Sequence, residues 1–590
     1  MISSRAIIVA SALILAGVQF AHAQAVYPGN PGSAHAAASP ACTAPPVRPA
    51  AGSKIWYVDP VHGITPAAGG NGSQKFPWSS LQGVLGQQWV NAPGQFPGYI
   101  RPLLSSQPYR HNGVIVADNI GNPPVHPGDT ILLASGNYGD VKIGGGPFPM
   151  SNSDWIRVQP VPVAGTVPVF NSLHIATANK WWFNGIKVTG VDTAVRITPL
   201  VQIADGGPTL PTDSIVLTNM QISTVDDATR WTQEQWLAQG RIGIDEVGHP
   251  GNGTNGYPTL TCVSVTNSKI KNVAYAAILG ANQSLFANND LGYFFNDGID
   301  FFGNGITITK NYEHDNFETE DGIHTDAMQG QNGPLGANSI NHFSNILIDS
   351  NLIIRDVDVK APFKTYLQGI VAFDEDWTHM AITNNVIVTS SCYSIAVSSI
   401  HDSLIANNTG IEDGLVASPG CEAAIGGGGS THEGPPSTNS RFTNNIAPFY
   451  TIGGLQDVNV TYDHNIAIEP NGQGIVHVEM KPNKSGVLVP TWVFGINVGT
   501  DQFGNVNSHT TSPAQEFLQF SPTTGNYNAM LKWTAQSLRI GAAPTGEMPQ
   551  RVGAAPTGEM PTTDILGVTR TAPYAAGAYG SGANSFSGGS

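Results

Sequence analysis

Short apolar segments that end in asparagine recur through the middle of the chain. They cover residues 216–219, 264–267, 285–289, 307–311, 347–351, 381–385, 404–408, 442–445 and 460–465. Several of the final asparagines lie 20 to 23 residues apart, and the longer steps fit one or two repeats with an insertion. This period is too short for propeller blades, and the segments lack the leucine spacing of leucine-rich repeats. The pattern predicts a parallel β-helix, in which short strands of successive coils stack about 4.8 Å apart.

Asparagine suits the corner between two strands of such a coil for two reasons. Its backbone tolerates the left-handed conformation that a tight corner needs, and its amide can bond to the asparagine of the next coil. Chance enrichment in asparagine would not explain why each one follows an apolar segment. We therefore expect an all-β solenoid with long loops inserted between regular coils.

Three further motifs resemble the secreted right-handed parallel β-helix proteins of the pectate-lyase-like superfamily. They are residues 56–63 with 72–82, residues 126–141, and residues 563–569 with 577–580, although Gly580 stands where that family usually has an acid. With the middle repeats, the resemblance spans about residues 54–580. It implies a right-handed parallel β-helix and an extended polysaccharide as substrate, but it does not specify a reaction.

The chain divides into five segments on this interpretation. Residues 1–23 are a signal peptide, 24–52 a flexible Ala/Pro-rich leader and 53–470 the β-helix. Residues 471–573 form the coils and loops that close it, and 574–590 a Gly/Ser-rich tail. A 12-residue duplication at 539–561 has too few copies to form a solenoid and is interpreted as an extended loop.

The first 23 residues have the three parts of a secretory signal. Arg5 provides the positive charge, residues 6–20 are apolar, and Ala21 and Ala23 provide the small residues before a cut that precedes Gln24. We expect a secreted or periplasmic protein with no membrane span in its mature chain. Export permits disulfides between the four cysteines, and proximity in sequence favours Cys392 with Cys421.

Composition narrows the function further. Only 12% of residues are charged, against about 25% on average, which excludes a coiled coil or a helical bundle. The formal charge of −16 has the wrong sign for binding nucleic acid. The oligomeric state does not follow from the sequence.

The acids concentrate in two neighbouring repeats, residues 296–302 and 320–329. Aligning the Gly-Ile pairs at 298–299 and 322–323 places five side chains on one patch, because alternate residues of a strand share a face. The patch consists of Asp297, Asp300, Asp321, His324 and Asp326. Asp-Gly is also a common corner sequence, so Asp297 and Asp321 have a structural alternative as turn residues.

The patch offers two kinds of chemistry. Crowded carboxyl groups raise the pKa of at least one member, and His324 can transfer protons near neutral pH. Alternatively, Asp297, Asp300 and Asp321 could hold Ca²⁺, which binds carboxylate oxygens.

Two longer segments flank the patch and could form the walls of a cleft. They contribute Arg355, Lys360 and Lys364, in a chain with few cations, together with Tyr366 and Trp377. We expect the aromatic rings to stack on sugars or, equally, to pack against the coil.

Three functions remain open. A polysaccharide lyase would use Lys364 or His324 as the base in β-elimination of a uronic-acid polymer, with cations neutralising the carboxylate. A hydrolase would use paired carboxyl groups such as Asp300 with Asp321 or Asp326. A glycan-binding or structural β-helix would need no catalyst. We favour the lyase.

Overall fold

The computed structural model describes only part of the chain. The described residues are 42, 44–46, 49–85, 103–106, 109–111, 114–116, 123–144, 150–190, 198–206, 209–247, 257–317, 325–330, 340–358, 366–373, 375–389, 393–412, 423–427, 434–448, 450–453, 456–468, 475–482, 484, 486, 488–494, 499–500, 506–507, 517–521 and 526–531. The predicted signal peptide, the 539–561 duplication and the tail lie outside them. Within them, no helix is long and apolar enough to cross a membrane.

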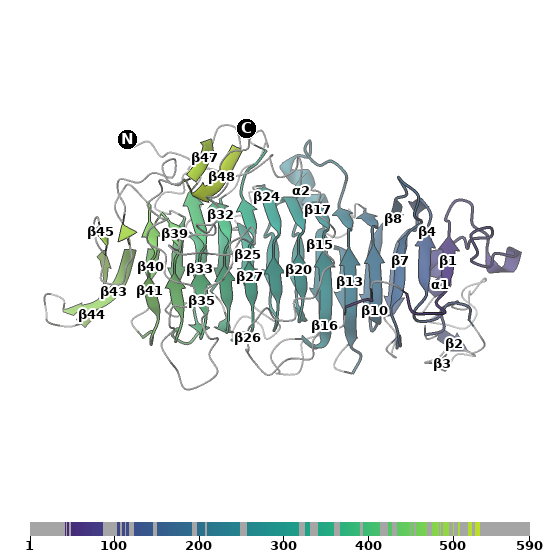
Figure 1. The fold of residues 1–590 in the computed structure, drawn as a ribbon, viewed down its shortest axis with the longest axis horizontal. Coiled ribbons are helices and arrows are strands. Elements are labelled where there is room, and N and C mark those ends of the chain that lie inside the picture. Colours follow the sequence, from purple (N-terminus) through teal and green to yellow (C-terminus); the bar gives the residue numbers. More distant parts are fainter. Residues whose placement is uncertain are drawn as a thin grey trace. The chain divides into compact units, whose positions relative to one another are not determined.

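The chain forms two compact units. Cys42–Asp290 is called the N-terminal unit here, and Leu291–Ser590 with Met1–Ala41 the C-terminal unit. In both units, parallel strands stack one coil after the next (Figure 1). The fold is a right-handed parallel β-helix, as the sequence predicts.

The N-terminal unit contains three parallel sheets. The first holds β1 (Ile55–Val58), β4 (Thr130–Leu133), β7 (Ile156–Pro160), β10 (Asn179–Asn184), β13 (Thr212–Thr218), β16 (Tyr257–Thr266) and β20 (Leu285–Ala287), with β19 (Ala281–Asn282) also paired to β16. The second holds β5 (Gly136–Asn137), β8 (Pro168–Phe170), β11 (Lys187–Thr189), β14 (Gln221–Ser223) and β17 (Lys269–Val273). The third holds β6 (Asp140–Gly144), β9 (Ser172–Ala176), β12 (Pro199–Ala204), β15 (Ile242–Val247) and β18 (Ala277–Leu279).

Among the described residues of this unit, the elements outside these sheets are short. They are the hairpin of β2 (Tyr109–His111) and β3 (Val114–Val116), the 3-10 helix η1 (Pro66–Ala68), and the helices α1 (Leu81–Leu85) and α2 (Gln233–Gln239). Helix α2 begins at a capping box, in which Thr232 and Gln235 each accept a hydrogen bond from the other's backbone N–H. Strand β21 (Asp290–Phe294) spans the boundary between the units.

The C-terminal unit repeats the same three sheets. The first holds β23 (Thr307–Thr309), β27 (Leu347–Asp349), β31 (Ala381–Thr383), β35 (Leu404–Ala406), β38 (Arg441–Thr443) and β41 (Thr461–Asp463). The second holds β24 (Tyr312–Asn316), β28 (Leu352–Ile354), β32 (Val386–Thr389), β36 (Thr409–Glu412), β39 (Ile446–Ala447), β42 (Ile466–Ala467), β46 (Val506–Asn507) and the antiparallel β45 (Gly499–Thr500). The third holds β22 (Ile299–Phe301), β25 (Thr325–Gly330), β29 (Leu367–Ala372), β33 (Tyr393–Val397), β37 (Ala424–Gly427), β40 (Tyr450–Ile452), β43 (Ile475–Pro482) and the antiparallel β44 (Leu488–Phe494).

This unit also has two smaller sheets. One consists of the parallel strands β26 (His342–Ser344), β30 (Asp376–Thr378) and β34 (Ile400–His401). The other is the antiparallel pair of β47 (Phe517–Ser521) and β48 (Asn526–Leu531).

A ladder of buried asparagines joins successive coils of the C-terminal unit, as predicted. In each step, one Oδ1 accepts hydrogen bonds of 2.9–3.0 Å from the backbone N–H and the Nδ2 of the asparagine one coil earlier. The members are Asn311, Asn351, Asn385, Asn408, Asn445 and Asn465. In the N-terminal unit Ser268 donates its N–H to Asn289 in the same way.

The left-handed backbone lies one residue before each ladder asparagine. Residues 310, 350, 384, 407, 444 and 464 have φ between 55° and 59°. Three of these residues are asparagines, whereas the others are Lys, Ser and His. The two tasks predicted for one asparagine are therefore divided between neighbours.

Aromatic side chains fill the interior of the C-terminal unit at a point where the facing residue is a glycine. Trp377 on β30 is 0% exposed and packs against Phe301 and Phe343, with ring centroids 5.4 and 5.2 Å away. A Cβ on Gly330 would lie 2.6 Å from the Trp377 ring, so only glycine leaves room for it. Trp377 is therefore a core residue and not part of a cleft wall.

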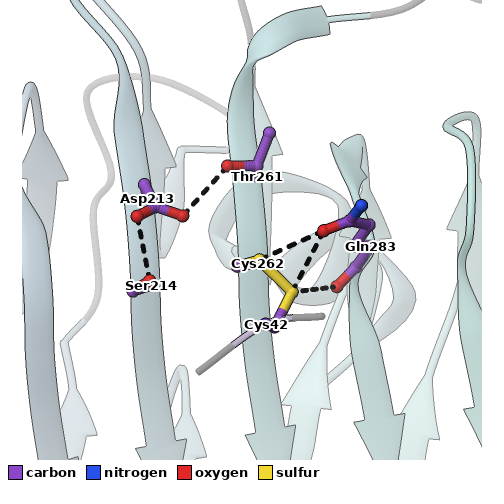
Figure 2. The surroundings of a disulfide bond; sticks show 6 residues. All are labelled: Cys42, Asp213, Ser214, Thr261, Cys262 and Gln283. Atoms are coloured by element: carbon purple, nitrogen blue, oxygen red, sulfur yellow. Dashed lines mark hydrogen bonds between the residues drawn. A yellow bond between two sulfur atoms is a disulfide. The ribbon is translucent and has the colours of Figure 1, made fainter. Parts of the chain in front are cut away.

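A disulfide anchors the N-terminal segment to the coil. Cys42 bonds to Cys262 on β16, and Gln283 places its Oε1 3.3 Å from both sulfurs (Figure 2). Pro46 accepts a hydrogen bond from Arg157. The predicted flexible leader is thus held to the coil from residue 42 on. The predicted partners Cys392 and Cys421 lie outside the described residues.

Candidate functional site

The register around Asp300 differs from the predicted alignment. Ile299 pairs with Met328 and Asp300 with Gln329, five residues beyond the Ile323 and His324 of the alignment. Ile299 and Phe301 are buried in the core, so alternation places Asp300 on the outer face of the third sheet. The outer row reads Asp300, Gln329, Val371 and Ala396.

Asp297 nevertheless contacts the backbone of Asp326. The backbone N–H of Asp326 donates to Oδ1 of Asp297 at 2.8 Å, and the N–H of Gly298 donates to the carbonyl of Asp326 at 3.0 Å. Asp297, Asp300 and Asp326 are all at most 4% exposed. Two neighbouring coils thus place three buried acids at one end of the third sheet. Alternation puts the Asp326 side chain on the inner face with Met328, opposite to the face of Asp300.

A fourth carboxyl group, Glu313, lies behind them inside the coil. It occupies a row in which the next coils carry Ile353 and Ile387, and a Cβ on Gly298 would lie 1.6 Å from its Oε1. Burial raises the pKa of Glu313 well above its usual range, and the charge of Asp297 raises it further. Burial therefore favours the uncharged form of Glu313.

The adjacent turn of β24 carries a histidine–carboxylate pair. Nδ1 of His314 lies 2.5 Å from Oδ2 of Asp315, whose other oxygen accepts the backbone N–H groups of Val357 and Asp358. Burial opposes the charge of Asp315, but these hydrogen bonds and His314 lower its pKa. The ring of Tyr312 stacks on His314 at 4.4 Å. The pair holds this turn together beside the carboxyl cluster.

The other predicted site residues are dispersed. Arg355 is fully buried, with its Nη2 3.7 Å from Asp356, and Trp377 is in the core. Tyr366 is 38% exposed, as a sugar-stacking residue would be. Asp321, His324, Lys360 and Lys364 lie outside the described residues.

The described part of the chain does not complete the predicted calcium site. No group of three His, Cys, Asp or Glu side chains among its residues could hold a metal ion. Asp297 uses one oxygen to bind the Asp326 amide, and Asp321 is not among these residues. Calcium at Asp297, Asp300 and Asp321 therefore stays a prediction.

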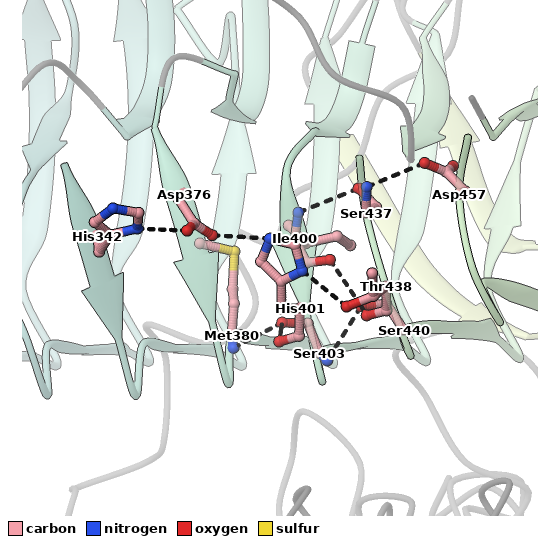
Figure 3. Close-up of polar contacts among 10 residues, drawn as sticks. All are labelled: His342, Asp376, Met380, Ile400, His401, Ser403, Ser437, Thr438, Ser440 and Asp457. Carbon is pink, nitrogen blue, oxygen red and sulfur yellow. Dashed lines mark hydrogen bonds and ion pairs between the residues drawn. The ribbon is translucent and has the colours of Figure 1, made fainter. Parts of the chain in front are cut away.

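A second polar cluster, which the sequence did not reveal, lies on the small sheet of β26, β30 and β34. Asp376 binds two imidazoles, with its Oδ2 2.5 Å from Nδ1 of His342 and its Oδ1 2.9 Å from Nε2 of His401 (Figure 3). The other nitrogen of His401 lies 2.8 Å from Oγ1 of Thr438. Burial opposes the charge of Asp376, but both histidines lower its pKa. Since His342 is 58% exposed, the row faces solvent at one end.

Comparisons with known proteins add only distant likenesses. No protein-family model and no curated protein matches the chain. Among solved structures, the chain is similar to pectate lyase Pel9A, with 12% identity, 86% of this chain and 96% of that one covered, and a TM-score of 0.38. The complex of XylC with xylose has 10% identity, coverages of 89% and 98%, and a TM-score of 0.41. A lacto-N-biosidase of family GH136 from Eubacterium ramulus has 10% identity, coverages of 70% and 63%, and a TM-score of 0.33. Sequence identities and TM-scores this low say nothing about the reaction of this chain.

Proposed function

We propose that this protein is a carbohydrate-active enzyme that cleaves a polysaccharide near Asp300. One observation carries the proposal: two neighbouring coils bring the buried acids Asp297, Asp300 and Asp326 to one end of the third sheet, and burial raises the pKa of Glu313 beside Asp297. A stack of apolar coils gains nothing in stability from four buried carboxyl groups, because each costs desolvation energy. Such an arrangement is typical of acid–base chemistry.

Hydrolysis is the reaction that the described residues support best. It needs one carboxyl group that donates a proton and one that is ionised, and a crowded, buried cluster provides both states. Asp300 is the leading catalytic candidate, since alternation places it on the outer face of the third sheet. Asp297 is the candidate for its partner among the described residues.

β-Elimination on a uronic-acid polymer, which the sequence favours, is the second candidate. The carboxyl cluster would hold the cation that neutralises the uronate, and His324 or Lys364 would remove the proton. Both of these bases lie outside the described residues, so this mechanism has less support than hydrolysis.

The products distinguish the two reactions. We would incubate the purified protein with neutral and uronic polysaccharides, with and without a chelator. Saturated reducing ends would support hydrolysis. Unsaturated uronic ends would support elimination, and their loss on chelation would support calcium. If the polymers bind but none is shortened, the protein is a binding module and the proposal is wrong.

Two variants locate the reaction. We expect Asp300→Asn to lower the rate at least a hundredfold with little change in folding, because it removes an acid–base group and keeps the shape of the side chain. Asp402→Asn is the matched control, since Asp402 accepts a hydrogen bond from Asn439 and lies outside the cluster. Equal activity of the two variants would move the reaction away from Asp300.

Export is part of the same proposal. The substrate is an extracellular polymer, and residues 1–23 have the pattern of a signal peptide. Amino-terminal sequencing of the protein recovered from outside the cytoplasm should begin at Gln24. An intact Met1 in that fraction would contradict a cleaved signal.

A further inference from the structure

A row of polar side chains runs along the outer face of the third sheet in the N-terminal unit. The register pairs Lys142 with His174, His174 with Gln202, and Gln202 with Asp245. The residues on either side of each member are buried, which places the row outside the coil. These flanking residues are Val141, Ile143, Leu173, Ile175, Val201, Ile203, Ile244 and Glu246.

The exposure of the row decreases from Lys142 to Asp245, and hydrogen bonds hold the backbone at the Lys142 end. Lys142 is exposed, His174 and Gln202 are half-buried, and Asp245 is 7% exposed. At the outer end, Gln82 accepts from the backbone N–H of Lys142 at 2.9 Å and donates to its carbonyl at 3.3 Å. The strand that carries Lys142 is therefore held in place before any ligand arrives.

The adjoining outer row of these strands carries small residues. Gly144 pairs with Ala176, and Ala176 with Ala204, and both Gly144 and Ala176 are buried. On the other side, Asp140 accepts a hydrogen bond of 2.6 Å from Ser172. At these positions, the ordered line of polar groups is therefore adjoined by short side chains.

We propose that the row Lys142–His174–Gln202–Asp245 binds an acidic polysaccharide chain. Its members follow at about 4.8 Å, the spacing of neighbouring strands, which is close to the length of one sugar unit. Lys142 would bind a carboxylate of the chain, and the other three would bond to hydroxyl groups. The assignment rests on the proposed carbohydrate function, but it uses none of the carboxyl groups of the C-terminal unit.

The charges along the row agree with such a ligand. Burial and the charge of Lys142 lower the pKa of His174, so its ring is neutral at pH 7 and both donates and accepts. Burial raises the pKa of Asp245 to about 7, so this end is only partly charged at neutral pH. Gln202 and Ile278 face Asp245 from the neighbouring strands. Glu246 beside it is held by the Ala281 amide and the Ser284 hydroxyl, and burial raises its pKa to about 8.

Calorimetry with two oligosaccharides of equal length, one uronic and one neutral, tests the site. The full-length protein carries Asp300→Asn in every arm, so that cleavage cannot consume the ligand. We expect Lys142→Ala to weaken binding of the uronic oligomer at least tenfold and to leave the neutral one nearly unchanged. Gln202→Ala should weaken both several-fold. Lys269→Ala, an exposed lysine of the second sheet, is the matched control and should change neither.

The pH dependence provides an independent measurement. Binding of the uronic oligomer should weaken between pH 6 and pH 8, as Asp245 acquires its charge, and Asp245→Asn should shift the onset of this weakening towards pH 8, where Glu246 begins to ionise. Unchanged affinity in Lys142→Ala and Gln202→Ala would overturn the proposal. Binding through the row without any cleavage by the wild-type protein would sink only the proposed enzyme function. Cleavage by the wild-type protein without binding at the row would refute the proposed binding site and leave the proposed enzyme function intact.

Discussion

Asn408 offers the sharpest test of what holds the coils together. Its Oδ1 accepts from the backbone N–H and Nδ2 of Asn385, and its Nδ2 donates to Ile382 and to Asn445. Asn408→Ala removes all four hydrogen bonds in a position that is 0% exposed. No water can replace them without opening the coil.

The magnitude follows from these contacts. A buried hydrogen bond contributes about 1 kcal/mol net, and a donor left without a partner costs about 1–3 kcal/mol. We therefore expect Asn408→Ala to lower the free energy of unfolding by about 4 kcal/mol. Since domains of ordinary stability have about 5–15 kcal/mol in total, the effect should be plain in a urea titration.

The neighbouring residue provides the control. Asn407 is equally buried, but its side-chain amide makes no hydrogen bond with any described residue. Its backbone has a φ of 58°. Asn407→Gly keeps that conformation without strain and should change the free energy by about 1 kcal/mol or less. Unfolding would be followed by circular dichroism at 25 °C. If both variants unfold at the same urea concentration, the amide ladder does not stabilise the coil as argued.

Three further predictions concern stability. Replacing Cys42 and Cys262 by serine should cost about 2–4 kcal/mol, because the bond closes a segment of 220 residues; an unchanged melting temperature would contradict this. Trp377→Ala should lower the free energy of unfolding by about 4 kcal/mol, because it leaves a cavity. A urea titration measures this loss, and a much smaller value would mean that the surrounding side chains close the cavity. Although burial opposes its charge, hydrogen bonds and Arg441 hold the pKa of Asp463 at about 2, below the value of about 3.9 for an unfolded chain. Its contribution is therefore present above pH 4 and lost as the pH falls towards 2, and Asp463→Asn should flatten that part of the acid titration.

The fold was accessible from the sequence because a coil repeats its chemistry. The spacing of Asn385, Asn408 and the other final asparagines reflects one physical task at each corner, so the period survives even where loops intervene. The division of labour between a left-handed residue and a ladder residue was not accessible. Several segments end in two asparagines, such as 384–385 and 407–408, and composition alone does not distinguish their roles.

The register of the candidate site was harder to predict. Ile299 pairs with a residue 29 positions later, whereas the matching Gly-Ile pairs suggested 24. An inserted loop adds little free energy whatever its length, so nothing in the sequence requires the coils to be equally long. The polar row of the N-terminal unit could not be found from the sequence for the same reason, since its members are 32, 28 and 43 residues apart.

The asparagine ladder also allows a whole coil to be removed or added without loss of the ladder's hydrogen-bond pattern. Every rung uses the same three atoms, and none depends on which coil comes next. Excising the 23 residues from 386 to 408 would set Asn385 against Asn445, and the rung would re-form with the same bonds. A deletion of half that length would leave both ends unmatched. Such a molecule can lengthen or shorten by whole turns while its loops, and the ligands they meet, change independently.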